Sequence, residues 1–303
     1  MIIISEQNTI KIQLKDTRDK IPTDTIGIDI GQSLTKIAYS IGNEIILTMN
    51  PTSSDFSEIN EFIELNKYRY NKINFTGGKA FVQYKKYSNE FETNLINEFD
   101  ANIGGVEFLY EYNKSKPLPP SIIVTLGTGT SIILKTDGIT HLGGSAMGGG
   151  FFMGLIRLIF QESIADYSEA INYASKGNRY QVDLKVGDIY NIEDNRVDKL
   201  FRAFTAAALG KINKNNDVNT AKKEDIILSL IGSIGENIGT IATLMAENHE
   251  VKNIIFCGGF LIGNKPLKQT LSLLCKYKRL KPMFLDNSVF AGAIGALEFN
   301  TNR

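Results

Sequence analysis

The chain has 303 residues, of which 43% are hydrophobic and 22% charged, a composition typical of a globular protein with one or two domains. Lys and Arg together number 33, as do Asp and Glu, so the formal net charge is zero. A chain without net positive charge is not generally attracted to nucleic acids or anionic membranes, and we expect neither as a partner.

The amino-terminal stretch MIIISEQNTI has no basic leader and its apolar run stops at Ser5, so we expect no signal peptide. No run reaches the roughly 20 uninterrupted apolar residues that a membrane span needs. Cys257 and Cys275 lie in apolar segments without a CxxC spacing, which favours buried, reduced thiols and argues against a zinc site. These features predict a cytoplasmic protein.

Two segments about a hundred residues apart share the pattern of a strand, a tight glycine-containing turn and a second strand. They are TIGIDIGQSLTKIAYS (residues 25–40) and SIIVTLGTGTSIILK (residues 121–135). In the first, isoleucines alternate with Gly27, Asp29 and Gly31, so one strand face is apolar and the other carries a carboxylate. Any α/β protein can contain one such hairpin, but the repetition predicts a duplicated lobe with a cleft between the copies.

A proline cluster, KSKPLPPS (residues 114–121), directly precedes the second hairpin and predicts the boundary between the lobes. We therefore expect an N-terminal lobe at 1–118 and a C-terminal lobe at 119–303. We also expect the last helix, about residues 290–300, to pack back on the N-terminal lobe.

The second half of the chain alternates helical and strand patterns, which indicates an α/β fold. Five glycines in residues 143–150 lead into an apolar helix at 151–160. A long helix with one apolar face is expected from about Lys222 to Asn248, and a buried strand ending in two glycines at 253–260.

Several of these segments could bind phosphate. Glycine-rich turns let backbone N–H groups approach phosphate oxygens, Asp29 could hold Mg²⁺ directly or through water, and Lys36 could reach a phosphate. The alternative for each turn is a solvated surface hairpin. The glycines before 151–160 form a helix start suited to an anion. Glu98, in the acidic segment NEFD, could act as a base, although acidic residues are also common on solvated turns.

No GxxxxGK[ST], protein-kinase motif set or GxSxG triad pattern occurs, so hairpins are the candidate phosphate-binding devices. The motifs resemble, in order, those of the eukaryotic-like, type II pantothenate kinases over about residues 24–299. The matching segments are DIGQSLTKIAY (29–39), TGGKAF (76–81), NEFD (97–100), TLGTGTSI (125–132), GGSAMGGGFFMGLIRLI (143–159), ASKGNRYQVDLKVGDIY (174–190), ENIGTIATLMA (236–246) and FLDNSVFAGAIGAL (284–297).

This resemblance implies two RNase H-like lobes of the actin/hexokinase-like superfamily with ATP and Mg²⁺ between them, in a homodimer. The implied reaction transfers the γ-phosphoryl group of ATP to the primary hydroxyl of pantothenate, the first step towards coenzyme A. Glu98 would be the general base, and Asp29 would handle Mg²⁺. The residues implied to bind nucleotide are Asp29, Gly31, Gln32, Ser33, Lys36, Gly127, Thr128, Gly129, Ser131, Gly148, Gly149, Gly150, Gly258, Gly259 and Phe260.

The residues implied to bind the acceptor are Glu98, Thr128, His141 and Gly143. His141 stands where the family usually has an arginine, and Gln32 replaces a glycine. Because histidine lacks the bidentate fork that grips a carboxylate, two other hypotheses stay open. One is a kinase of the same superfamily for another small alcohol or sugar, and the other is a catalytically silent nucleotide- or CoA-binding regulator. Retention of Glu98, Asp29 and Lys36 argues against the silent regulator.

Overall fold

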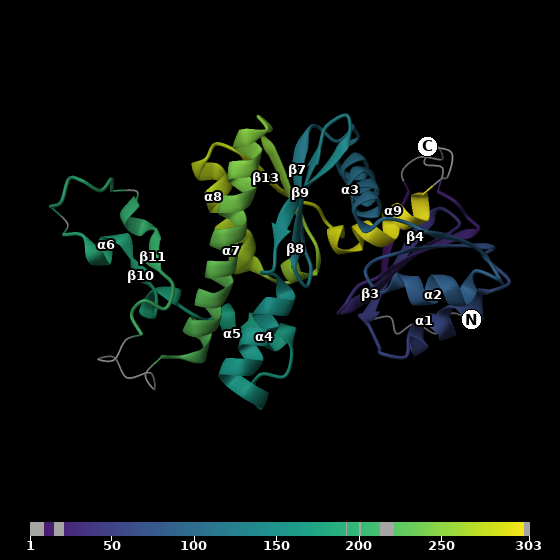
Figure 1. Ribbon diagram of the computed structural model, residues 1–303, viewed down its shortest axis with the longest axis horizontal. Coiled ribbons are helices and arrows are strands. Elements are labelled where there is room, and N and C mark those ends of the chain that lie inside the picture. Colours follow the sequence, from purple (N-terminus) through teal and green to yellow (C-terminus); the bar gives the residue numbers. More distant parts are fainter. Residues whose placement is uncertain (1–8, 15–20, 192, 200, 213–220, 300–303) are drawn as a thin grey trace.

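The computed structural model describes most of the chain, namely residues 9–14, 21–191, 193–199, 201–212 and 221–299 (Figure 1). The first eight residues, for which we expect no signal peptide, lie outside the described part. The described residues form two lobes, each built on one mixed β-sheet with helices packed on its faces.

The first lobe contains a six-stranded sheet in the order β1-β4-β3-β2-β5-β6. Strands β2, β3 and β4 are antiparallel, whereas β5 pairs parallel to β2 and β6 parallel to β5. The elements of this lobe are β1 (Thr9–Gln13), β2 (Thr25–Ile30), β3 (Leu34–Ile41), β4 (Glu44–Pro51), α1 (Ser57–Asn66), β5 (Lys72–Thr76), α2 (Ala80–Tyr87) and β6 (Glu92–Leu95).

The second lobe repeats this arrangement in a five-stranded sheet of order β13-β12-β7-β8-β9. Here β7, β8 and β9 are antiparallel, and β12 and β13 follow in parallel. The strands are β7 (Ser121–Leu126), β8 (Thr130–Lys135), β9 (Ile139–Ser145), β12 (Asn253–Cys257) and β13 (Lys281–Phe284). Apart from the edge strand β1, the two orders correspond strand for strand, which confirms the predicted duplicated lobe.

Helices α3 (Glu98–Lys114) and α9 (Ala291–Glu298) cross between the two sheets (Figure 1). Their backbones approach so closely that a Cβ atom on Gly105 would lie 1.9 Å from the carbonyl oxygen of Ala291. A Cβ atom on Gly295 would likewise lie 1.8 Å from the carbonyl oxygen of Ala101. Only glycine fits at these two positions, so the crossing explains both residues.

Helix α9 packs closely on the face of β2 that bears the small residue Gly27. The isoleucines of β2 point into an apolar cluster with Phe62, Tyr70 and Phe75 on the opposite face. On the α9 side, a Cβ atom at Gly27 would lie 2.2 Å from the carbonyl oxygen of Ala293. The alternation seen in the sequence therefore separates a core face from a face that receives α9.

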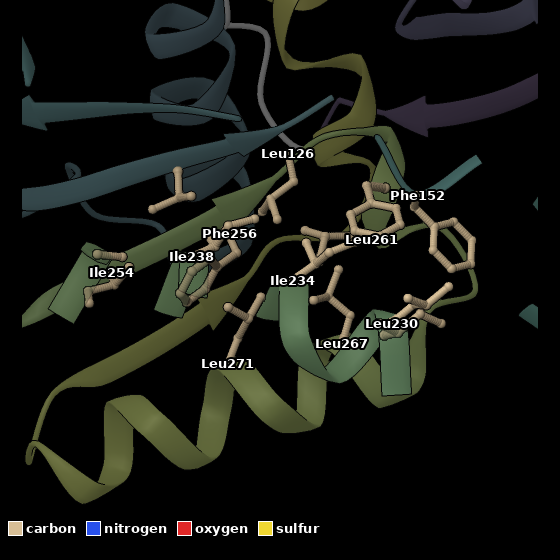
Figure 2. Packing of buried hydrophobic residues seen from close by; sticks show 14 of the residues in the cluster. Leu126, Phe152, Leu230, Ile234, Ile238, Ile254, Phe256, Leu261, Leu267 and Leu271 are labelled. Carbon is tan, nitrogen blue, oxygen red and sulfur yellow. The ribbon is translucent and has the colours of Figure 1, made fainter. Parts of the chain in front are cut away.

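The core of the second lobe lies between its sheet and the helices α7 (Lys223–Asn248) and α8 (Lys265–Tyr277) (Figure 2). Side chains of α7 such as Ile234 and Ile238 pack against strand residues such as Phe256. Among the described helices, α7 alone is long and apolar enough to cross a membrane by length and composition. Most of that apolar stretch is buried within the lobe, as in the core helix of a globular protein.

The insertion between β9 and α7 contains α4 (Gly149–Phe160), α5 (Tyr167–Ala174), β10 (Leu184–Lys185), α6 (Val186–Ile189) and β11 (Thr205–Ala207). Helices α4 and α5 pack into the core of the second lobe, whereas β10, α6 and β11 extend on the side away from α3 and α9 (Figure 1).

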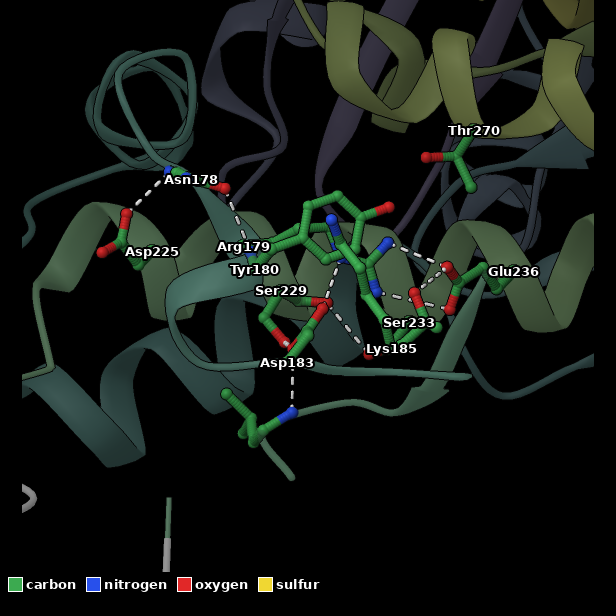
Figure 3. A network of polar contacts seen from close by, with 12 residues as sticks. Asn178, Arg179, Tyr180, Asp183, Lys185, Asp225, Ser229, Ser233, Glu236 and Thr270 are labelled. Atoms are coloured by element: carbon green, nitrogen blue, oxygen red, sulfur yellow. Dashed lines mark hydrogen bonds and ion pairs between the residues drawn. The ribbon is translucent and has the colours of Figure 1, made fainter. Parts of the chain in front are cut away.

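A buried polar network fastens this insertion to α7 (Figure 3). The Arg179 guanidinium pairs with the fully buried Asp183 and donates to Glu236 of α7 at 2.9 Å. The hydroxyl of Ser229, also on α7, donates to the Asp183 carboxylate. Since a buried charge needs partners, this part of the ASKGNRYQVDLKVGDIY segment has a structural role.

Candidate active site

The two glycine-rich turns come from different lobes and lie against each other. Gly31–Ser33 joins β2 to β3, and Gly127–Gly129 joins β7 to β8. The hydroxyl oxygens of Ser33 and Thr128 are 3.3 Å apart, within hydrogen-bond distance. Two lobes thus bring two glycine-rich turns and two hydroxyls to one place, as a polyphosphate site requires.

Beside the first turn, Asp29 and Lys36 form an ion pair across the β2–β3 hairpin. The two residues face each other in the strand register, and Lys36 Nζ donates to Asp29 Oδ2 at 2.9 Å. The Asp29 carboxylate is tightly enclosed, because a Cβ atom on Gly77 would lie 2.6 Å and one on Gly292 2.9 Å from its oxygens. The two glycines therefore make room for this carboxylate.

Glu98 begins α3 and lies close to this ion pair. The side chain of Asn97 caps the helix by accepting from the Phe99 N–H at 2.8 Å, which fixes the direction of the first turn. Partial withdrawal of the Glu98 carboxylate from water raises its pKa, the negative charge of Asp29 raises it further, and Lys36 acts in the opposite direction. A carboxylate with a raised pKa, whose side chain remains solvent-accessible, is suited to accept a proton.

His141 reaches the same region from the second lobe. It lies on β9 and stacks on the ring of Phe99, with ring centroids 4.4 Å apart and an interplanar angle of 17°. His141 therefore contacts the residue that follows the candidate base in the chain. The structure therefore brings together Glu98, Asp29 and Lys36 from the first lobe with His141 from the second.

The glycines at the start of α4 support the second turn. The N–H of Gly149 donates to the Gly127 carbonyl at 2.8 Å, and the N–H of Gly150 donates to the Thr128 carbonyl at 2.9 Å. A Cβ atom on Gly148 would lie within 2.7–2.8 Å of three carbonyl oxygens of that turn. These two amides are therefore already bonded within the protein and not free for an anion. The resemblance implies that Gly148, Gly149 and Gly150 contact the nucleotide, and in the structure they hold the second turn in place.

The segment after β12 contains three predicted nucleotide-binding residues, Gly258, Gly259 and Phe260, and each has a different environment. Gly258 has a φ of 105°, and a Cβ atom there would lie 2.4 Å from the Leu126 carbonyl oxygen, so close strand packing requires glycine. Gly259 approaches the first lobe, since its Cβ position lies 3.2 Å from Leu34 Cδ1. Phe260 is only 2% exposed and its ring packs among aromatic side chains of the core. Its ring therefore forms part of the core, and the nucleotide contact that the resemblance implies stays a prediction.

The remaining predicted residues lie on strands next to the second turn. Ser131 is on β8, paired with Thr125 of β7 and Gly144 of β9. Gly143 has a φ of 134°, and no atom lies within 4 Å of its Cβ position, so conformation and not crowding favours glycine.

Three residues close to the site were not singled out from the sequence, although the quoted motifs contain them. Gly77 and Lys79 belong to TGGKAF, and Phe99 belongs to NEFD. The loop after β5 packs on the first turn, with the Lys79 N–H donating to the Ile30 carbonyl at 3.0 Å. A strand pattern cannot reveal which loop covers a neighbouring turn, so these contacts required the structure.

The region offers little direct coordination for a metal ion. Within the described residues, no group of three or more His, Cys, Asp or Glu side chains is arranged to hold one. Asp29 lies on β2 two residues before the first turn, but Lys36 already pairs with it. These residues fit a Mg²⁺ ion bound mainly by substrate phosphates and water, with Asp29 acting through a water molecule.

Sequence comparison matches this chain to one protein family over most of its length. The Fumble family model matches residues 43–298. A type II pantothenate kinase from Bacillus anthracis is 32% identical over 282 residues, which cover 92% of this chain and 98% of the relative. One from Oceanobacillus iheyensis is 32% identical over 276 residues, covering 90% and 98%.

Solved structures resemble this chain in fold at much lower identity. The activator of the 2-hydroxyisocaproyl-CoA dehydratase from Clostridium difficile, with bound ADPNP, has a TM-score of 0.57 at 16% identity, covering 90% of this chain and 92% of the activator. A ROK family glucokinase from Streptomyces griseus, in complex with glucose and AMPPNP, has a TM-score of 0.54 at 13% identity, covering 92% and 99%. Both likenesses support the predicted two-lobed fold.

Proposed function

We infer that this chain, which belongs to the Fumble family of type II pantothenate kinases, transfers the γ-phosphoryl group of ATP to the primary hydroxyl of pantothenate. The product is 4′-phosphopantothenate, and the reaction is the first step of coenzyme A biosynthesis. Identity of 32% over 92% of the chain supports this activity. The observation that carries the site assignment is the approach of the two turns, joined between Ser33 and Thr128.

In the proposed mechanism, Glu98 accepts the proton of the pantothenate hydroxyl as its oxygen attacks the γ-phosphorus. Its raised pKa fits this role, because a base with a pKa closer to neutrality holds the proton better while remaining ionised. Asp29 and Lys36 shift that pKa in opposite directions, and their ion pair keeps both charges fixed beside the base.

The two turns would hold the triphosphate from opposite sides. Gly31, Gln32 and Ser33 would contact it from the first lobe, and Gly127, Thr128, Gly129 and Ser131 from the second. Because phosphoryl transfer depends on positioning and on neutralising charge, such a site needs few reactive side chains. Mg²⁺, when bound, neutralises charge that develops on the phosphate oxygens.

The acceptor would lie between Glu98 and His141. Support comes from the stacking of His141 on Phe99, the residue that follows the proposed base in the chain. Thr128 in the second turn and Gly143 on β9, paired with Ile132 of β8, would complete the acceptor site from the second lobe. The imidazole can donate one hydrogen bond to the acceptor's carboxylate, without the two-pronged grip of an arginine.

The proposal also covers the lobe division, the cellular location and the oligomeric state of the protein. Two lobes divided near residue 118 act as units, linked by α3 and α9. The enzyme works in the cytoplasm, in keeping with Cys257 and Cys275, which are both buried and unpaired. It forms a homodimer, as the family resemblance implies.

A panel of alcohols tests the acceptor. Purified protein is incubated with ATP, Mg²⁺ and pantothenate, or with sugars and other small hydroxy acids, and ADP release is compared with phosphorylated product by mass spectrometry. We expect stoichiometric product with pantothenate. Turnover on another alcohol, with none on pantothenate, would refute the assigned acceptor while leaving the kinase fold and base in place.

A further inference from the structure

One cation beside the first turn has no role in the mechanism so far. Lys79 ends the loop after β5 and occupies the N-cap position of α2. Its ammonium lies 3.4 Å from the carbonyl oxygen of Gln32, which is the central residue of the turn Gly31–Ser33. Its position is therefore set by the turn that the proposed function assigns to phosphate.

The loop that carries Lys79 is held rigidly against the end of β2. Its backbone N–H donates to the Ile30 carbonyl at 3.0 Å, and Ala80 donates to Gly77 at 3.0 Å. Gly77, at a φ of 95°, fits only because it has no Cβ that would clash with Asp29 and Ile30. The base of the lysine side chain is thus fixed at the end of β2, next to the turn.

Lys79 and Lys36 differ in whether a carboxylate balances their positive charge. Lys36 is paired with Asp29 at 2.9 Å, so much of its positive charge is balanced within the protein. Among the described residues, no carboxylate pairs with Lys79, whose one polar contact is to a neutral carbonyl. An ammonium has three donors, so two remain for a ligand.

We propose that Lys79 binds the terminal phosphates of ATP, supplying at the first turn the positive charge that Lys36 shares with Asp29. This inference rests on the proposed function, since it assumes that a triphosphate lies between the two turns. A lysine acts as a compact point charge towards phosphate and forms charge-assisted hydrogen bonds. Lys79 is then a nucleotide-binding residue distinct from the general base.

Equilibrium binding of ATP and of adenosine, measured without acceptor by calorimetry, tests the assignment. Lys79→Ala removes the ammonium, whereas Lys79→Gln keeps an N–H donor for the Gln32 carbonyl but no charge. We expect both variants to raise the Kd for ATP about tenfold, the typical effect of losing one charge-assisted hydrogen bond, and to leave that for adenosine unchanged. Lys79→Arg should stay within about threefold of wild type, because it keeps the charge.

The matched control is Lys85→Ala, on the exposed side of α2, where the ammonium lies over the Phe81 ring. It changes the net charge equally, so an equal loss of ATP affinity would reduce the effect to long-range electrostatics and overturn the proposal. Wild-type ATP affinity in Lys79→Gln would also overturn it. Failure of the wild-type protein to bind ATP would refute the proposed function as well, whereas a wrong acceptor would leave these measurements unaffected. Melting temperatures of the unliganded variants identify any loss caused by unfolding.

Discussion

The substitution Glu98→Gln separates proton transfer from nucleotide binding. Glutamine keeps the size of the side chain and its place in the first turn of α3, but it cannot accept the proton of the acceptor hydroxyl. Loss of a general base lowers turnover by about 10²–10⁴-fold, or about 3–5 kcal/mol of activation free energy. Among the described residues, no hydrogen bond joins the Glu98 carboxylate to the second turn, so we expect the Kd for ATP to stay within about twofold.

The same substitution, Glu98→Gln, should not lower the stability of the fold. The pKa of Glu98 is raised in the folded state, so folding binds protons, and stability falls as the pH rises from the unfolded to the folded pKa. Above that window the ionised carboxylate is unfavourable, mainly because it is partly withdrawn from water and also because Asp29 is near. Removing its charge should leave the melting temperature at pH 7.5 unchanged or higher, which excludes unfolding as the cause of lost turnover.

The assay measures kcat with saturating ATP and pantothenate, and ATP affinity by calorimetry. Asp100→Asn is the matched control, because Asp100 is an exposed carboxylate in the same helical turn and should keep nearly full activity. In the wild-type enzyme, kcat should fall with decreasing pH at a higher pH than an unperturbed glutamate would produce. The reasoning fails if Glu98→Gln retains more than a tenth of wild-type kcat, or if ATP binding and turnover are lost together.

Three further substitutions test the framework by urea unfolding. Lys36→Met leaves the enclosed Asp29 carboxylate without its partner and should lower the free energy of unfolding by about 3 kcal/mol; a change below 1 kcal/mol would mean that the pair is not formed. Gly105→Ala should cost about 3 kcal/mol because its Cβ would meet backbone of α9, whereas Gly104→Ala, with 3.6 Å to the nearest atom, should cost nothing; equal effects would refute the close crossing. Arg179→Met should cost about 3 kcal/mol through loss of the buried network while the Kd for ATP is unchanged, and weakened ATP binding would place this network in the site.

The repeated hairpin was the part of the fold that the sequence predicted best. Alternating isoleucines before Gly31 and the matching run before Gly127 depend only on local periodicity, and both hairpins are present. Their order in the chain also indicated two lobes. Glu98 was found through the family motif alone, because its distance to Asp29 depends on how α3 packs between the sheets.

What the sequence could not predict was the partner of each glycine and aromatic residue. Glycines before a helix suggest an anion site, but the N–H groups of Gly149 and Gly150 bond to the second turn instead. Phe260 follows two glycines as a binding residue might, yet its ring is part of the core. Nothing in the local pattern of TGGKAF distinguishes Lys79, whose contact with the first turn depends on how its loop packs. In each case tertiary contacts decide the role, and local pattern carries no information about them.

The most direct test of the account is an experimental structure of the protein with a non-hydrolysable ATP analogue and pantothenate. We predict the triphosphate between Gly31–Ser33 and Gly127–Gly129, with the primary hydroxyl of pantothenate about 2.6–3.2 Å from the Glu98 carboxylate. Triphosphate bound elsewhere, or a hydroxyl directed away from Glu98, would contradict the proposed site.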